Sequence, residues 1–212
     1  MNKYVIFDFD GTLADSENIV IDACNTLSEK HKFKKIQNKD IDHLRGLSII
    51  DKCKFLSVPA YKLPFWAIEF YGLFKAAIDN LKLFDGIKEL LEELTNRGYN
   101  LAIISSNSEE IIREFLKKNN ISCFNKIYCS SNLFGKDKVI KNFLKKYDIE
   151  KSEAIYVGDE RRDIIACKKN KLKVIWVKWG FDKLEGVQSE EPDFVAETPM
   201  DILEIVEKHS YL

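Results

Sequence analysis

The feature that most constrains this chain is an apolar stretch near its start that leads directly into two carboxylates. Residues 3–7 have the sequence KYVIF, and this β-branched and aromatic run predicts a strand buried on both faces, as in a parallel sheet. Asp8 and Asp10 follow it, and Gly11 allows the chain to turn sharply. In open parallel sheets the ligand crevice lies beyond the carboxyl ends of the strands. We therefore expect both carboxylates at the rim of a chemical site.

The remainder of the chain divides into a helical segment and an alternation of strands with helices. Apolar residues recur at helical spacing, with no strand-like run between them, in residues 14–30, 40–55 and 64–81. Further along, the sequence predicts strands that alternate with helices, at residues 100–104, 126–129, 153–157, 173–177 and, marginally, 194–195. This order predicts an α/β fold with a doubly wound parallel sheet and a helical module inserted after the first strand.

Composition excludes several classes of partner. A formal net charge of −1 over 212 residues gives no support for a nucleic acid or an anionic membrane. No apolar run approaches the roughly 18 to 20 residues that a membrane span needs. The five cysteines show no CxxC spacing, which favours free thiols in a reducing compartment. We expect a cytoplasmic protein, a monomer or a homodimer, that acts on a small molecule.

Polar residues follow four of the predicted strands, and each suits chemistry on a phosphoryl group. A carboxylate such as Asp8 can attack phosphorus and form an aspartyl-phosphate. Asp10 can protonate the leaving oxygen and later deprotonate a water molecule. Ser105, with the backbone N–H groups beside it at a helix start, can bind phosphoryl oxygens. Lys136 supplies a positive charge, although Lys138 remains an alternative for that position.

The acids of this set also predict a metal. Asp8, Asp159 and Asp163 offer only oxygen donors, which are the ligands that Mg²⁺ prefers. Without a cation these carboxylates would repel one another and a phosphate dianion. The sequence therefore predicts a magnesium site at the same edge of the sheet.

These residues carry a resemblance to a known family. The sequence DFDGTL at residues 8–13 resembles the first motif of the haloacid dehalogenase-like hydrolase superfamily. Ser105 and Lys136 match the serine and lysine of its second and third motifs, and GDERRD at residues 158–163 matches the fourth. The resemblance spans nearly the whole chain. It implies a Rossmann-like core of residues 1–13 and 84–212 and a mobile helical cap of residues 14–83.

The resemblance also implies roles for individual residues. It makes Asp8 the nucleophile and Asp10 the acid and base. Its metal ligands are Asp8, the main-chain carbonyl of Asp10, and Asp159, with Asp163 supporting the metal or Lys136. The dehalogenase branch lacks the second aspartate, because a halide leaving group needs no proton. Asp10 therefore favours a phosphatase over a dehalogenase.

The helical segment is most similar to the caps of phosphoglycolate phosphatases, and we expect it to carry substrate specificity. Arg45 and Gly46 fall where related phosphatases place residues that meet the substrate. We also expect substrate contacts from Thr12, Ser106 and Asn107. The aromatic residues of the third helical pattern have a helical period, and we interpret them as packing inside the cap.

Two other functions remain open at this point. A phosphosugar mutase of the β-phosphoglucomutase kind shares the core and the cap, but it keeps its aspartyl-phosphate long enough to transfer it to another sugar hydroxyl. A non-catalytic regulatory module would bind Mg²⁺ and phosphate without turnover. The prediction favoured here is a Mg²⁺-dependent phosphatase that hydrolyses a small phosphomonoester.

Overall fold

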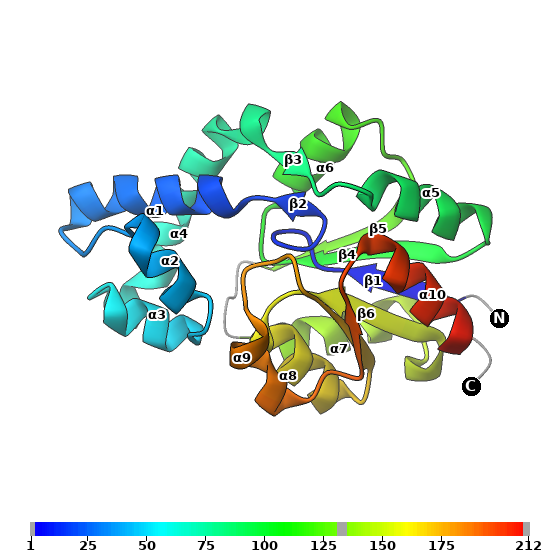
Figure 1. The fold of residues 1–212 in the computed structure, drawn as a ribbon. Helices are drawn as coiled ribbons and strands as arrows, with labels where there is room; N and C mark the ends of the chain where they lie inside the picture. The colour runs from blue at the N-terminus through cyan, green and yellow to red at the C-terminus, as the bar shows by residue number, and fades with distance from the viewer. Residues whose placement is uncertain (1–2, 131–134, 210–212) are drawn as a thin grey trace.

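The centre of the molecule is a parallel sheet of six strands (Figure 1). The computed structural model describes residues 3–130 and 135–209, so the two ends of the expected core, residues 1–2 and 210–212, lie outside the described residues. In spatial order the strands are β5 (Phe124–Cys129), β4 (Asn100–Ser105), β1 (Tyr4–Phe7), β6 (Ala154–Gly158), β7 (Lys173–Val177) and β8 (Phe194–Ala196). Every neighbouring pair is parallel, and β1 lies between β4 and β6. The predicted α/β fold with a doubly wound sheet is confirmed.

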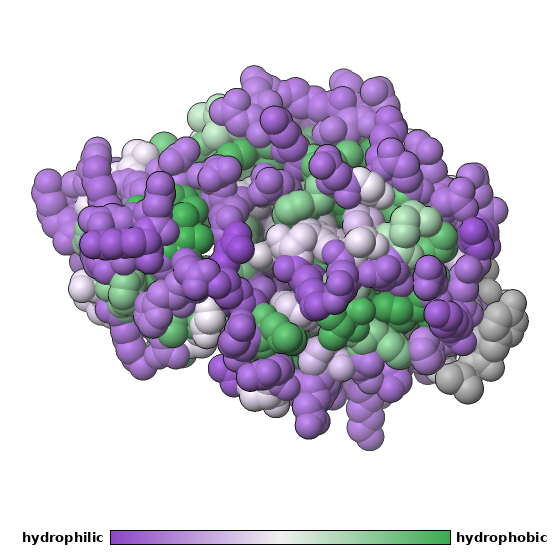
Figure 2. All heavy atoms as spheres, viewed as in Figure 1, coloured by the Kyte–Doolittle hydropathy of each residue, from purple (hydrophilic) through white to green (hydrophobic). Residues whose placement is uncertain are grey.

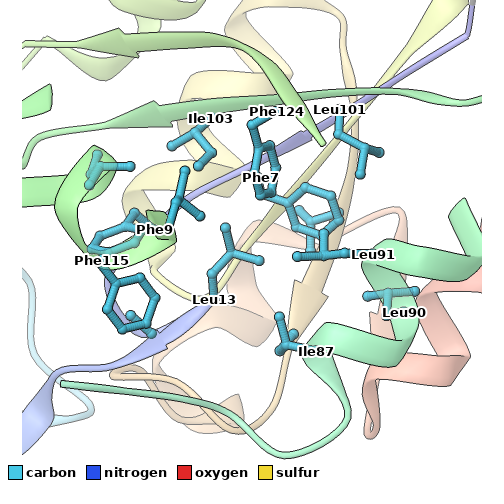
Figure 3. Close-up of a cluster of buried hydrophobic side chains, with 14 of the residues drawn as sticks. Phe7, Phe9, Leu13, Ile87, Leu90, Leu91, Leu101, Ile103, Phe115 and Phe124 are labelled. Atoms are coloured by element: carbon cyan, nitrogen blue, oxygen red, sulfur yellow. The ribbon is translucent and has the colours of Figure 1, made fainter. Parts of the chain in front are cut away.

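Helices cover both faces of the sheet because alternate residues of each strand point to opposite sides. On one face α5 (Ile87–Asn96), α6 (Glu109–Lys118) and α10 (Pro199–His209) pack on Val5 and Phe7. Figure 3 shows this cluster, in which Phe7, Leu90, Leu91 and Phe124 gather beneath the strands. On the other face α7 (Lys136–Tyr147) and α8 (Arg161–Asn170) pack on Ile6 and Tyr156. The core therefore consists of two apolar layers with the sheet between them.

A helical insert follows the first strand, and it lies to the left of the sheet in Figure 1. Its helices are α1 (Glu17–His31), α2 (Asn38–Leu44), α3 (Ile49–Phe55) and α4 (Leu63–Ala76). The chain enters the insert through β2 (Ala14–Asp15) and leaves it through β3 (Lys82–Leu83), and these two strands pair antiparallel. Within the described chain, residues 16–81 contain helices and no strand. The predicted helical module is confirmed.

The structure differs from the sequence prediction at three short elements. The pattern over residues 40–55 forms two helices, because the chain breaks between Leu44 and Ile49 and the Ser48 hydroxyl accepts a hydrogen bond from Asp51 N at 3.2 Å. The antiparallel pair of β2 and β3 was not predicted, because strands of two residues are too short to show an alternation of apolar and polar residues. The four-residue helix α9 (Leu184–Val187) was also not predicted.

The residues that the structure describes also include four single turns of 3₁₀ helix: η1 (Ala60–Lys62), η2 (Ile78–Asn80), η3 (Lys151–Glu153) and η4 (Gln188–Glu190). Hydrophilic residues cover most of the face shown in Figure 2. Among the helices that the structure describes, none has both the length and the apolar character needed to cross a bilayer.

Candidate active site

The site is built around Asp8, the first residue after β1. Its backbone N–H donates to Val157 O at 2.8 Å, which extends the pairing of β1 with β6 by one residue. Asp8 is 2% exposed, and its Oδ1 accepts a hydrogen bond from Phe9 N at 2.7 Å. On the other oxygen, Oδ2, Lys136 Nζ lies at 2.5 Å. Asp8 is thus a buried carboxylate with one cation directly beside it.

Lys136 is the first residue of α7, and its side chain reaches from that helix into the site. Its Nζ forms a second ion pair with Asp163. Burial lowers the pKa of Lys136, but the carboxylates of Asp163 and Asp8 raise it by more, so the ammonium group stays charged. Lys138, two residues further along, is exposed to solvent. Of the two lysines considered from the sequence, the structure brings Lys136 to Asp8.

Asp10 lies where the core faces the helical insert. Its Oδ2 accepts a hydrogen bond from Asn107 Nδ2 at 3.0 Å. Its Oδ1 is buried and has no hydrogen-bond partner among the described residues. Burial, with a further contribution from the charge of Asp8, raises the pKa of Asp10 to about 6. This carboxyl group can therefore exchange a proton close to neutral pH.

Three carboxylates gather at one point of the site. Asp8, Glu160 and Asp163 each offer an oxygen, and these oxygens all lie within 4.8 Å of one another. Burial raises the pKa of Glu160, but Arg162 and two nearby lysines, Lys52 and Lys136, lower it by more. Such a set of hard oxygen donors fits Mg²⁺. Glu160 was not among the residues expected from the sequence.

Asp159 has different partners from those expected. Its Oδ1 accepts a hydrogen bond from Thr12 Oγ1 at 2.8 Å and its Oδ2 accepts one from Phe181 N at 2.7 Å. Burial, together with the charges of Glu160, Asp163 and Asp8, raises its pKa well above the ordinary value. The structure thus places the carboxyl group of Asp159 outside the group of three carboxylates, and Thr12 beside Asp159.

Two glycines explain this orientation. Gly11 has a φ of +76°, and a Cβ there would lie 2.3 Å from Asp159 Oδ2. A Cβ on Gly180 would lie 2.1 Å from the Cβ of Asp159. A side chain at Gly11 or Gly180 would collide with Asp159, so the lack of a Cβ at these two positions lets both backbone segments pack directly against it. Through its hydrogen bonds with Thr12 and Phe181, Asp159 connects the turn after β1 to the loop after β7.

The end of β4 supplies hydroxyl and amide groups. Ser105 is 3% exposed, and its Oγ accepts a hydrogen bond from Asn107 N at 2.9 Å. Asn107 Oδ1 accepts one from Ser108 N at 2.8 Å, and Ser108 caps the start of α6. Ser106 Oγ accepts a bond from Arg162 Nη2 at 3.4 Å. These residues form a compact loop at a helix N-terminus, a place that favours anions.

The two residues expected from the insert have different surroundings. Arg45 donates from Nε and Nη2 to the two carboxylate oxygens of Glu17, at 2.9 Å and 2.5 Å. Gly46 packs on Gly186 of α9, where an added Cβ on Gly186 would lie 3.2 Å from the Gly46 Cα. Arg45 therefore lines the space between insert and core, while Gly46 serves a contact between them.

A cavity of 590 Å³ opens from this site into the insert. On the core side its walls include Asp10, Ser106, Asn107 and Arg162. Glu160, one of the three gathered carboxylates, is also part of the cavity wall, whereas Asp8 and Lys136 are not. A molecule in the cavity therefore contacts both Asp10 and Glu160.

Sequence reasoning missed three residues that help to build the site. Glu160 and Arg162 lie inside the GDERRD stretch, two positions apart, and form an ion pair with a 2.5 Å separation. Lys52, from the insert, forms a 3.0 Å ion pair with Asp182 of the core. The charged residues between the two motif aspartates were the available signal for the first pair. Nothing in the local sequence signals the second, because its partners are 130 residues apart.

Comparison with known proteins agrees with this architecture. The family model described as haloacid dehalogenase-like hydrolase matches residues 5–177. A phosphoglycolate phosphatase from Synechococcus elongatus is 29% identical over 203 residues, which are 95% of this chain and 96% of that protein. The pyrophosphatase PpaX of Listeria monocytogenes is 27% identical over 95% of both chains. A haloacid dehalogenase-like hydrolase of Streptococcus pneumoniae has a solved structure with a TM-score of 0.81 and 24% identity, covering 96% of this chain and 98% of its own.

Proposed function

Because this chain belongs to the haloacid dehalogenase-like hydrolase family, we propose that it is a Mg²⁺-dependent phosphatase that hydrolyses a small phosphomonoester. The observation that carries the proposal is the presence of two neighbouring carboxyl groups in different environments. Asp8 lies against the Lys136 ammonium group, while burial raises the pKa of Asp10 to about 6. One carboxyl group contacts a cation and the other can carry a proton, which is the division of roles that ester hydrolysis needs.

In the first step Asp8 is the nucleophile. A carboxylate oxygen of Asp8 attacks the phosphorus atom, and the bond from phosphorus to the ester oxygen breaks. Asp10 donates its proton to that oxygen, so that the alcohol leaves neutral. Lys136 stays charged and balances the negative charge of the phosphoryl group on Asp8.

In the second step Asp10 is the base. It takes a proton from a water molecule, whose oxygen attacks the phosphorus atom of the aspartyl-phosphate. The bond between phosphorus and the Asp8 oxygen breaks, which returns the Asp8 carboxylate and releases inorganic phosphate. The hydrogen bond from Asn107 Nδ2 orients the Asp10 carboxyl group in both steps. Ser105, Ser106 and the start of α6 bind the phosphoryl oxygens.

A divalent cation fits this site because its three gathered carboxylates offer hard oxygen donors. Bound Mg²⁺ would supply positive charge that offsets the charge of the phosphoryl oxygens. We assign it to Asp8, Glu160 and Asp163. The set implied by the family resemblance, Asp8 with the Asp10 carbonyl and Asp159, is the alternative.

Mg²⁺ binding to two variants separates these ligand sets. With the proposed set, Glu160→Gln weakens Mg²⁺ binding about tenfold or more in titration calorimetry, whereas Asp159→Asn changes it by much less. If Asp159→Asn weakens Mg²⁺ binding more than Glu160→Gln does, the ligand set implied by the resemblance is correct. Thermal unfolding of both variants checks that they remain folded.

The proposed reaction is tested by phosphate release from a panel of phosphomonoesters and pyrophosphate, with Mg²⁺ and with a chelator. Two of the relatives are named phosphoglycolate phosphatase and pyrophosphatase, so phosphoglycolate and pyrophosphate are tested first. We expect turnover that requires Mg²⁺ and falls at least a thousandfold in Asp8→Asn. Turnover that persists in the chelator or in Asp8→Asn would contradict the mechanism. Accumulation of a phosphorylated protein with a sugar phosphate acceptor would indicate a mutase.

We propose residues 14–83 as the cap and residues 1–13 with 84–212 as the core, supported by the β2 and β3 pairing where the chain passes between them. The partner is a small phosphorylated metabolite. A cytoplasmic location, which fits the free thiols of the five cysteines, remains a prediction.

A further inference from the structure

The cavity between insert and core is much larger than the phosphate site needs. It has a volume of 590 Å³ and reaches from Asp10 and Asn107 far into the helical insert. Pockets for drug-sized ligands have volumes of roughly 300 to 1,000 Å³. A two-carbon acid would fill a small part of this space and leave most of its wall in contact with water.

The wall of the cavity beyond the core is almost entirely apolar. It is formed by α1 to α4 and the loops between them, with aliphatic side chains such as Leu27 and Ile41. Aromatic rings make up much of it. Trp66 and Phe70 of α4 line it, and Phe33 stacks on Trp66 with ring centroids 5.5 Å apart. These aromatic residues were expected to fill the insert, but the structure leaves an open space between them and the facing helices.

The cations on the cavity wall already have partners. Of the described residues, three basic side chains line the cavity, and each forms an ion pair with a carboxylate. Arg45 pairs with Glu17, Lys52 with Asp182, and Arg162 with Glu160. A second anionic group on the substrate, such as the carboxylate of phosphoglycolate, would find no uncommitted positive charge in this wall. Breaking one of these pairs to bind it would leave a carboxylate without its partner.

We infer that the cavity holds the organic part of the substrate, and that this part is an apolar alkyl or aryl group longer than two carbons. The inference rests on the proposed phosphatase function, because it orients the ester with its phosphoryl group at Asp8. The alcohol then extends past Asp10 into the apolar space. Burial of its hydrocarbon surface against the aromatic wall supplies the binding free energy.

A series of alkyl phosphates tests the inference on the unmodified protein. We measure kcat/KM with Mg²⁺ for ethyl, butyl, hexyl and octyl phosphate, and for phosphoglycolate. Each methylene buried in the cavity raises kcat/KM about fourfold until the cavity is filled. Equal rates along the series, or a preference for phosphoglycolate over hexyl phosphate, would overturn the inference.

Two matched variants locate the effect in the cavity. Ala67 of α4 lines the cavity, so Ala67→Phe fills part of it and reduces the ratio of the octyl to the ethyl rate at least tenfold. Ala76→Phe makes the same change at an exposed position of the same helix and keeps the ratio of the unmodified protein. Equal ratios in the two variants would contradict this placement. Thermal unfolding shows whether each variant is folded.

Binding without turnover separates this inference from the proposed function. Ethylphosphonate and hexylphosphonate lack the ester bond, and calorimetry compares their affinities for the Mg²⁺-loaded protein. Turnover of every ester with no dependence on chain length would overturn the apolar substrate class and leave the phosphatase standing. Tighter binding of hexylphosphonate with no turnover of any ester would overturn the phosphatase and support the apolar ligand.

Discussion

At the scale of single residues, the site depends on charges that are removed from water. Lys136 is buried and Asp10 is half-buried, and their environments act in opposite directions. Burial raises the pKa of Asp10 to about 6, because its main partner is a neutral amide rather than a cation. Lys136 contacts two carboxylates and remains charged. We therefore expect replacements of these two residues to change the free energy of unfolding in different ways.

Asp10→Asn is expected to stabilise the metal-free protein above pH 6. The pKa of Asp10 rises from 3.8 to about 6 on folding, so its favourable contribution is complete below pH 3.8 and is lost as the pH rises through 6. An amide has no charge to desolvate, which gives the variant an advantage of up to about 3 kcal/mol at pH 8. Urea unfolding with a chelator at pH 4 and pH 8 measures the difference. A gain that is the same at both values, or one also seen for the exposed Asp22→Asn, would contradict this cause.

Lys136→Met is expected to destabilise the protein by about 3 to 5 kcal/mol at neutral pH, because it leaves two buried carboxylates without their cation. The matched variant Lys138→Met changes an exposed side chain and is expected to stay within about 0.5 kcal/mol of the unmodified protein. Urea unfolding of both without Mg²⁺ makes the comparison. Similar stabilities for the two variants would mean that the Lys136 pairs contribute little.

At the scale of elements, the turn after β1 determines where the chemistry is placed. The chain turns back between Phe9 and Ala14, where Ala14 N donates to Phe9 O at 3.0 Å. Gly11 lies in this turn with its backbone against the Asp159 carboxyl group. Through Asp159 the turn contacts the end of β6 and the loop after β7. These contacts fix the positions of Asp8 and Asp10 relative to the other strand ends.

Gly11→Ala tests these contacts against a matched glycine. Gly11 and Gly98 have φ values of +76° and +82°, so alanine strains the backbone similarly at both. Only at Gly11 does the new Cβ collide, 2.3 Å from Asp159 Oδ2, whereas nothing lies within 4 Å at Gly98. We expect Gly98→Ala to lose about 1 kcal/mol and Gly11→Ala at least about 2 kcal/mol more. Equal losses in urea unfolding would show that the collision is relieved without cost.

At the scale of the whole molecule, the insert contacts the core on two sides of the cavity. Tyr71 of α4 donates from its hydroxyl to the Ser106 carbonyl on one side. Lys52 of α3 reaches Asp182 on the other, and the backbone N–H of Lys183 donates to Arg45 O at 3.1 Å. These contacts hold the insert over the site and shield it from water, which favours ionic chemistry within.

Removing one contact from each side is expected to open the molecule. The double variant Tyr71→Phe with Lys52→Met loses two partly buried polar contacts. We expect this loss to favour, by about 2 kcal/mol, forms in which the insert has moved away from the core. Small-angle X-ray scattering without ligand should then give a larger radius of gyration. Lys75→Met is the control, because its pair with Glu110 also joins insert and core but lies on the surface and contributes little. An unchanged radius in the double variant would mean that other contacts hold the insert in place.

The fold class and most of the residues at the strand ends could be predicted from the sequence. β1 and β7 are buried apolar runs of strand length, and apolar residues recur at helical spacing in the insert. Short-range patterns of apolar residues were therefore sufficient to predict these elements. Asp8, Asp10 and Ser105 could be named because each follows the end of a predicted strand. Lys136 could be named because it follows Gly135 after the strand predicted at residues 126–129, and in the structure it is the first residue of α7.

Which of these groups lie in contact, and what space they enclose, depends on how distant segments pack together. Thr12 forms a hydrogen bond with Asp159 across 147 positions of sequence, and the Asp159 carboxyl group lies outside the group formed by Asp8, Glu160 and Asp163. The large apolar cavity is likewise invisible in the sequence, because its aromatic residues have the same helical period whether they fill a core or surround an open space. The direction of a side chain and the volume between helices depend on packing among distant segments, and a local pattern contains neither.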